Sequence, residues 1–526
     1  MITKISTKNI NQLPKQNNNS TSFKGPGAAA LNGLNFLATN QGLGACAVDF
    51  CSMVTPRTLI DFKKRGTQAG IETSIREGTS CFIHAAIGVI GTAIGAVISN
   101  KFNKAFGIKA HNIYANGETI DYCADVWRAT KTKKEYFRSI LSQMQGLDGQ
   151  VWKKIPEDVI ENVSESLSHA KENKAIVKEA VAKISQAIGA QGNFRIGNGK
   201  SFISNSADII LDNARSLGEA FKKVDVNDTN LFNSFVRKLK STKLKTTVVG
   251  MGLCALLCMS VQPINRYLTK KRTGKDGFVG VEGASADNSK EFKIKKTAIG
   301  LGMLTAMHAS IGKPQNYLKN IQFNSKFPSI NQFKFLYGAT IASRILSARD
   351  KNELREGVIK DSLGFTNWLI LGGFVSRLAA RAMGKDLINN PVVAENGKKG
   401  IKYAFEWLTK SSVKNFNEIL MPAAKEITKD GRLMNVGELF KAADKVTKTK
   451  VLKAAGAQVL GYLYSGLVLG VGIARLNIAI TNRFKNNEKA KKMAQNPVVK
   501  VNKTVTQNND NMPMTFTMSN KISKFQ

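Results

Sequence analysis

GTSCFIHAAIGVIGTAIGAVISN, residues Gly78 to Asn100, carries no charged side chain over 23 positions. Two more charge-free apolar stretches follow it, Thr246 to Asn265 and Ala454 to Ala474. A helix needs about 20 mostly apolar residues to cross the roughly 30 Å hydrocarbon layer of a bilayer, and each stretch reaches that length. The three stretches therefore predict helices that cross a membrane, in a chain that is otherwise rich in lysine.

The length and charge of the chain bound its architecture and its class of partner. Its 526 residues and 43% hydrophobic content predict a sizeable folded part, divided into about two to four domains. The formal net charge is +39, which favours anionic partners: an acidic membrane surface, nucleic acid or acidic proteins. The same charge also fits a proteome rich in lysine and asparagine, with the cations spread over solvated faces.

Composition divides the chain into alternating polar and apolar regions. Between Val159 and Ile184 the apolar residues fall mostly three to five positions apart, which is typical of amphipathic helices, and strand signals are scarce. The sequence therefore predicts an all-α, multi-helix membrane-embedded protein with a water-facing helical domain and disordered basic termini. The predicted regions are a disordered polar tail (1–27), apolar and interfacial helices (28–100) with the candidate span 78–100, a mixed-charge helical domain (101–245), apolar helices (246–382), a polar helical segment (383–453), a candidate span (454–482) and a disordered basic tail (483–526).

The region 246–382 is predicted to hold three apolar helices, at 246–265, 297–312 and 362–376. The second and third are short for a full crossing, so buried core helices, tilted half-spans and short spans all fit them, and we favour the membrane. The intervening loop 266–296 is rich in glycine and has nine Lys or Arg in 31 residues, which is typical of a cytoplasmic loop. Its candidate contacts for lipid phosphates or an acidic partner are Lys270, Lys271, Arg272 and Lys275.

Small residues repeat at helical spacing in two of the three long stretches. Gly91 and Gly95 form one GxxxG pair, and Gly466 and Gly470 form another. Such a pair lets a second helix approach closely in lipid. We expect these four glycines to pack helices within one chain, and homodimerisation is the alternative.

The ends of the three long stretches share a pattern of asparagine, a cation and an aromatic residue. At a membrane boundary the cation reaches lipid phosphate, the aromatic ring lies at headgroup level, and the charge complements a helix C-terminus. A soluble helix that ends at asparagine in a basic protein is the alternative. The candidate interface anchors are Lys101, Phe102, Arg266, Tyr267, Arg483 and Phe484.

Motifs for catalysis and cofactors fail on spacing or context. The GKS at Gly199 to Ser201 lacks the first glycine of a P-loop, and the glycines at 277, 280 and 283 follow no expected strand. The six cysteines include no CxxC pair and the four histidines do not cluster. We therefore assign no catalytic, cofactor-binding or metal-ligating residue and expect a non-enzymatic protein.

Two histidines, His84 and His308, lie in apolar stretches. A contact between them would provide a site for protons or a polar solute. The alternative, which we favour, is a neutral imidazole that is hydrogen-bonded to a neighbouring helix.

These patterns predict an integral, multi-pass membrane protein whose partner is a bilayer with anionic headgroups. The N-terminal residues include no continuous apolar run, so we expect no cleavable signal peptide. Two alternatives stay open: a soluble or peripheral basic protein that binds anionic lipid or nucleic acid, and a membrane-inserting effector. A transporter would show more ionisable residues inside the membrane and clearer repeats than this sequence suggests.

Overall fold

The computed structural model describes residues 26–169, 174–196, 201–323, 327–370, 373–396 and 400–495. Residues 1–25 and 496–526, which make up most of the two tails predicted to be disordered, lie outside the described residues. For residues 483–495 the prediction is wrong, because they form the last turns of a helix. Internal contacts divide the chain into two units, 1–478 and 479–526, and each is described by itself.

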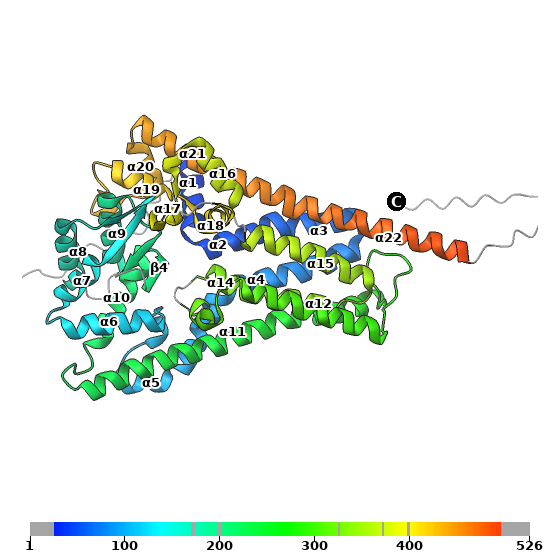
Figure 1. Cartoon of the computed structure of the whole chain (residues 1–526), viewed down its shortest axis with the longest axis horizontal. Helices are drawn as coiled ribbons and strands as arrows, with labels where there is room; N and C mark the ends of the chain where they lie inside the picture. The colour runs from blue at the N-terminus through cyan, green and yellow to red at the C-terminus, as the bar shows by residue number, and fades with distance from the viewer. Residues whose placement is uncertain are drawn as a thin grey trace, which may run out of the picture. The chain divides into compact units, whose positions relative to one another are not determined.

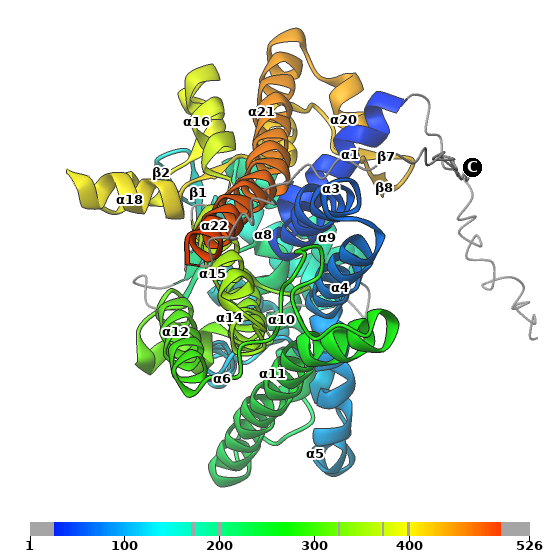
Figure 2. The ribbon, with the colours of Figure 1, turned by 90° about the vertical axis from the view of Figure 1, so that its right-hand side faces the viewer.

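The first unit begins with a series of helices joined by very short connections. Gly66 alone separates α3 from α4, and its φ of +89° permits the tight reversal that places the two helices side by side (Figure 2). The elements are α1 (Pro26–Thr39), α2 (Gln41–Ala47), the π-helix η1 (Val48–Val54), α3 (Thr55–Arg65), α4 (Thr67–Ile98) and α5 (Asn100–Phe106).

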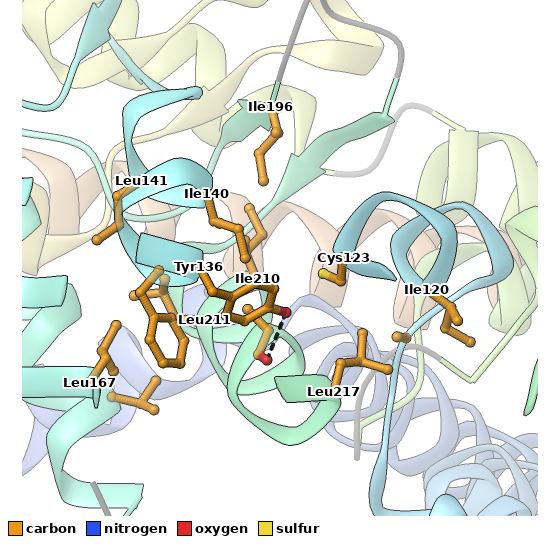
Figure 3. Packing of buried hydrophobic residues seen from close by; sticks show 14 of the residues in the cluster. Ile120, Cys123, Tyr136, Ile140, Leu141, Leu167, Ile196, Ile210, Leu211 and Leu217 are labelled. Atoms are coloured by element: carbon orange, nitrogen blue, oxygen red, sulfur yellow. Dashed lines mark hydrogen bonds between the residues drawn. The ribbon is translucent and has the colours of Figure 1, made fainter. Parts of the chain in front are cut away.

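The region after α5 has its own hydrophobic core, and Figure 3 shows Tyr136, Ile140 and Leu217 among the side chains packed there. The Tyr136 hydroxyl donates a 3.0 Å hydrogen bond to the carbonyl of Ala214 within this core. The elements are η2 (Ala110–Asn112), α6 (Gly117–Ala129), α7 (Lys133–Ser142), β1 (Met144–Asp148), β2 (Val151–Lys154), α8 (Glu157–His169), α9 (Lys174–Ile188), β3 (Phe194–Ile196), β4 (Ser201–Asn205) and α10 (Ala207–Phe221).

The chain is mostly helical, but the all-α prediction misses an antiparallel sheet of four strands in the order β2-β1-β3-β4. The hairpin between β1 and β2 turns at Gly149, whose φ is +63°, and Asp148 pairs with Val151 across the turn. A glycine with positive φ at the first position of a two-residue loop is the usual signal for such a hairpin. The Asp148-Gly149 dipeptide carried that signal in the sequence.

The next elements include α11, a 45-residue helix that contains the stretch 246–265. It runs antiparallel to α4, since Asn265 Nδ2 donates a 3.2 Å hydrogen bond to the carbonyl of Glu72 while Gly250 lies beside Gly91 at the other end (Figure 1). The elements are α11 (Thr229–Thr273), α12 (Lys290–Ala309), η3 (Pro314–Asn316), α13 (Tyr317–Asn320), α14 (Ile330–Leu346), α15 (Lys351–Phe365) and the π-helix η4 (Thr366–Ile370).

The remaining elements are mostly short until the last helices of the chain. A third π-helix, η7, joins α21 to α22, so that a continuous helical segment runs through the stretch 454–474. The elements are α16 (Phe374–Met383), η5 (Lys385–Leu387), β5 (Ile388–Asn389), α17 (Pro391–Asn396), α18 (Ile401–Lys410), β6 (Ser412–Val413), α19 (Phe416–Leu420), η6 (Met421–Ala423), β7 (Thr428–Lys429), β8 (Arg432–Leu433), α20 (Val436–Ala442), α21 (Lys445–Tyr464), η7 (Ser465–Gly472) and α22 (Ile473–Gln495).

Four helical segments among the described residues are long and apolar enough to cross a membrane: Gly42–Arg65, Thr67–Ile98, Thr229–Thr273 and Lys445–Lys491. Two of them contain predicted stretches, and Thr67–Ile98 covers all but the last two residues of 78–100. The segment Gly42–Arg65 was not predicted, because charged residues interrupt it.

The two shorter predictions in this part of the chain have different outcomes. Most of 297–312 lies in α12, whereas 362–376 is divided among α15, η4 and α16 and forms no single helix. Residues 371 and 372, inside that second stretch, lie outside the described part. The expected loop 266–296 is shorter, since α11 continues to Thr273 and α12 begins at Lys290.

Candidate functional site

Charged side chains from four helices converge on a cavity of about 60 Å³, which is room for several water molecules. Arg57, Asp61 and Arg65 are spaced four residues apart and so lie on one face of α3. The opposing helices supply the other charged residues of the lining: Glu72 and Arg76 from α4, Arg344 from α14, and Glu353, Glu356, Lys360 and Asp361 from α15.

Arg344 is the centre of one group of ion pairs. Its guanidinium lies 2.7 Å from Glu77 and 3.0 Å from Asp361, and all three side chains are buried. Lys360 Nζ approaches the other oxygen of Glu77 at 2.7 Å. One buried and one mostly buried cation therefore compensate two buried carboxylates, as charges removed from water require.

Arg349 is the centre of a second group. Its guanidinium lies 2.8 Å from Glu72 and 2.9 Å from Glu353. The ring of Phe278, from the segment between α11 and α12, lies against this group, 5.9 Å from the Arg349 guanidinium and 5.1 Å from that of Arg65. Such contacts between a cation and a ring face are favourable and remove the ion pairs further from solvent.

The pKa values of two of these cations move in opposite directions. Burial alone would lower the pKa of Arg344, but the adjacent carboxylates of Glu77 and Asp361 raise it, so this guanidinium is always charged. Burial and the nearby charge of Arg76 lower the pKa of Lys360 to about 8, and the opposing effect of Glu77 does not offset them. Lys360 is thus the cation of the site that is closest to losing its proton near neutral pH.

Arg57 binds a backbone carbonyl of a π-helix and not a carboxylate. Its Nε and Nη2 donate hydrogen bonds of 3.3 and 3.1 Å to the carbonyl of Leu469 in η7. The shifted hydrogen-bond pattern of a π-helix leaves backbone groups available, and such segments are frequent at functional sites. The first π-helix, η1, packs directly against η7 next to this contact.

The four predicted packing glycines face other segments of the same chain. The Cβ position of Gly91 points at the ring of Phe323, and that of Gly95 lies 3.2 Å from Thr246 of α11. The Cβ position of Gly470 would lie only 2.1 Å from the carbonyl oxygen of Ser52 in η1, and Gly466 also faces Ser52. All four glycines thus lie against other segments of the same chain, and Gly470 directly faces a backbone atom.

The predicted interface anchors have different environments. Lys101 is exposed, but Phe102 is buried beside Phe106 and Phe235 in the hydrophobic core of the region after α5, so it is not placed for a lipid headgroup. Arg266 is half-buried and Tyr267 is exposed, both near the end of α11. The remaining two anchors, Arg483 and Phe484, lie in the second unit, on α22.

The four predicted anion contacts are exposed. Lys270, Lys271 and Arg272 form the last turn of α11, and Lys275 follows in the loop. Lys270 makes an exposed 3.0 Å ion pair with Asp276. Three cations at a helix C-terminus also complement the helix dipole.

The two histidines contact different residues of α14. His84 Nε2 lies 3.4 Å from the hydroxyl of Thr340, and His308 stacks on the ring of Phe335. The described residues thus contain the histidine-to-helix hydrogen bond that the sequence favoured for His84. Among the described residues, no three His, Cys, Asp or Glu side chains are grouped so that they could hold a metal ion.

Sequence reasoning missed the charged cavity because its residues lie outside the uncharged stretches. Glu77 immediately precedes the stretch that begins at Gly78, and the charged residues of α3 were expected in an interfacial helix. The sequence did contain one signal for this cavity. Arg57, Asp61 and Arg65 recur every four residues between apolar stretches, so they lie on one face of a helix, and this face needs charged partners if it is buried.

Comparison with protein families, with characterised proteins and with solved structures gives no match for this chain.

Proposed function

We propose that the chain is a multi-pass, non-enzymatic membrane protein, with its four long apolar segments crossing a bilayer around a charged cavity. The observation that carries this proposal is the inverted polarity of these helices, whose buried residues are mostly small or polar and whose exposed residues in the apolar stretches are mostly large and apolar. A helix on the surface of a water-soluble protein has the opposite arrangement. In a bilayer the apolar side chains face lipid, and small residues allow the helices to pack closely.

The longest helix, α11, has this inverted pattern most clearly. Its exposed positions are large and apolar, among them Leu256, whose side chain is 66% exposed. Transfer of these side chains from water into lipid is favourable for each of them. Most inward residues of this stretch are small or polar, namely Thr246, Thr247, Gly250, Cys254, Cys258, Gln262, Asn265 and Thr269, beside the larger Met251 and Val261, and the outward ones include Val248, Val249, Leu253, Leu256 and Ile264.

The other two predicted stretches repeat the pattern. On α4, Phe82, Val89 and Val97 are each more than 70% exposed, while most buried positions are small or polar, with Ile87 as the large apolar exception. On α21 and η7 the exposed large apolar residues are leucines and valines, and the buried residues are mostly alanines and glycines. An exposed apolar surface of this extent is typical of a membrane or partner interface.

The ends of the long segments are aligned as they would be in one hydrocarbon layer. Asn265 of α11 is hydrogen-bonded to Glu72 of α4, which lines the charged cavity, and Leu469, near the end of the apolar stretch 454–474, is hydrogen-bonded to Arg57 of the same lining. At the opposite ends, Gly95 of α4 lies beside Thr246 of α11. Apolar segments of about 20 residues, aligned in this way, match the roughly 30 Å thickness of the hydrocarbon layer.

The test is fractionation of membranes from cells that express the full chain, washed first with high salt and then with alkaline carbonate. We expect retention through both washes. Release by salt would overturn the proposal and favour a peripheral protein bound to anionic lipid or nucleic acid. A chain that stays soluble until vesicles are added would instead favour the membrane-inserting effector.

A matched pair of variants sharpens this test. Val249→Lys with Leu256→Lys places two cations on the exposed face of α11, where each lysine near the centre of a span costs about 2.5–3.5 kcal/mol of insertion energy. Val151→Lys places one on the exposed strand β2 of the water-facing region. The first variant should lose carbonate-resistant protein and the second should not; equal behaviour would argue against a span at α11.

A further inference from the structure

The charged cavity is balanced in sign. Its lining contains five cations and five carboxylates, so neither a lone anion nor a lone cation is favoured by net charge. The cations are Arg57, Arg65, Arg76, Arg344 and Lys360, and the carboxylates belong to Asp61, Glu72, Glu353, Glu356 and Asp361.

Three acceptor atoms of the lining have no hydrogen-bond partner among the described residues. They are Oε2 of Glu72, Oδ2 of Asp361 and Oε1 of Gln262. The side chains of Glu72 and Asp361 are only 4% and 0% exposed, and the second oxygen of each is already used by an arginine. A buried oxygen without a donor is unfavourable by about 1–3 kcal/mol, and more when the group is charged, so these atoms need a ligand with donor groups.

Some donor groups of the lining lack a hydrogen-bond acceptor. Nε of Arg344 and Nε of Arg76 make no hydrogen bond in the described part of the chain, although Arg76 Nε lies 3.4 Å from a carboxylate oxygen of Glu77. Arg57 is buried, and among the described residues its hydrogen bonds go only to the carbonyl of Leu469, with no carboxylate within 4.0 Å. These guanidinium groups therefore need a ligand with acceptor groups, and a carboxylate is the usual partner of arginine.

We propose that this cavity binds a small zwitterion, with its carboxylate toward Arg57 and Arg76 and its ammonium group toward Glu72 and Asp361. A simple anion would leave the unpartnered carboxylate oxygens facing negative charge, and a simple cation would leave the guanidinium groups unsatisfied. Room for several waters restricts the ligand to one the size of a small amino acid.

The test uses the purified full-length chain in detergent and isothermal titration with glycine and β-alanine as probes. Acetate and methylammonium, at the same ionic strength, supply each charge separately. We expect saturable heat and a raised Tm with at least one zwitterion and neither effect with the single ions. No saturable binding of either zwitterion at millimolar concentration, which would leave the cavity to water alone, or equal binding of acetate, would overturn the proposal.

Variants then locate the binding. Gln262→Met keeps the volume and removes the unpartnered amide oxygen, and Arg57→Gln removes the carboxylate partner. We expect affinity to fall about tenfold for the first, the equivalent of one hydrogen bond, and beyond measurement for the second, while Arg138→Gln, on an exposed arginine of α7, leaves affinity unchanged. If Arg57→Gln gives no cooperative unfolding transition, that variant is not folded and the affinity of Gln262→Met is the test. Unchanged affinity of Gln262→Met for the zwitterion would then mean that binding occurs outside this cavity.

This proposal does not depend on the bilayer. Titration in detergent reports on the cavity, whereas fractionation reports on the apolar helices. A chain released by salt that still binds glycine or β-alanine would contradict the membrane proposal and leave the zwitterion site standing.

Discussion

The hydroxyl of Ser343 in α14 donates a hydrogen bond to the carbonyl of Met259 in α11. Pro263 lies four residues after Met259 inside the same helix and has no N–H to offer that carbonyl. The side chain from a neighbouring helix therefore replaces the missing backbone donor, which is how proline is tolerated in helices away from water. This contact connects α14 to the middle of the longest apolar helix.

A double-mutant cycle measures this replacement. Ser343→Ala removes the donor and should lower the free energy of unfolding by about 1–3 kcal/mol, because the Met259 carbonyl is left without a partner. In a Pro263→Ala background the backbone N–H of residue 263 reaches the carbonyl, and the same Ser343→Ala change should have a smaller effect. Thermal unfolding in detergent gives the four values; identical effects of Ser343→Ala in both backgrounds would contradict the compensation.

The buried ion pairs of Arg344 should be costly to break. Arg344→Met leaves Glu77 and Asp361 without their shared cation, and removing one partner of a buried pair typically costs 3–5 kcal/mol. Arg432→Met, which breaks a partly exposed pair with Glu438, should be far less costly.

The rescue variant separates charge from packing in the Arg344 site. Adding Glu77→Gln and Asp361→Asn to Arg344→Met removes the uncompensated charges and should recover much of the lost stability in denaturant unfolding. If the triple variant is no more stable than Arg344→Met alone, the loss arises from packing and not from buried charge.

Lys360 should make stability depend on alkaline pH. Burial, together with Arg76, lowers its pKa to about 8, whereas lysine in an unfolded chain titrates near 10.4. Between these two values the unfolded state binds more protons, so this group adds stability as the pH rises from about 8 to 10. We expect the chain to gain roughly 2 kcal/mol over this range relative to Lys360→Met. Parallel pH profiles for the two proteins, measured by denaturant unfolding, would rule this out.

The long apolar helices were predictable because lipid and water act on whole segments. Gly78 to Asn100 and Thr246 to Asn265 have no charged residue, and composition alone sets them apart. The segment Gly42–Arg65 escaped because Asp49 and Arg57 interrupt it, and both side chains are buried in contacts that only the folded chain provides. The hairpin at Gly149 was not predicted because its strands are short.

The charged cavity was not predictable from the sequence for a different reason. Its ion pairs join residues far apart in the chain, such as Arg344 with Glu77 and Arg349 with Glu72. In a single sequence each of these charged residues only interrupts an apolar pattern, and nothing indicates which residue is its ion-pair partner. Helical spacing in α3 indicated that one face is charged, but only the packing of α3, α4, α14 and α15 turns that face inward.

Gly470 should tolerate no side chain, in contrast to a glycine that faces open space. Gly470→Ala would place a methyl group 2.1 Å from the carbonyl oxygen of Ser52, so η1 and η7 must separate and the Tm should fall. Gly252→Ala, in the interior of α11 with no atom within 4 Å of the new methyl, should raise stability by about 0.5–1 kcal/mol through reduced chain entropy. Thermal unfolding of both variants gives opposite signs if η1 packs on η7 within one chain. A rise in Tm for Gly470→Ala would mean that these two π-helices are not in contact, and the hydrogen bond from Arg57 to Leu469 would then have no support from packing.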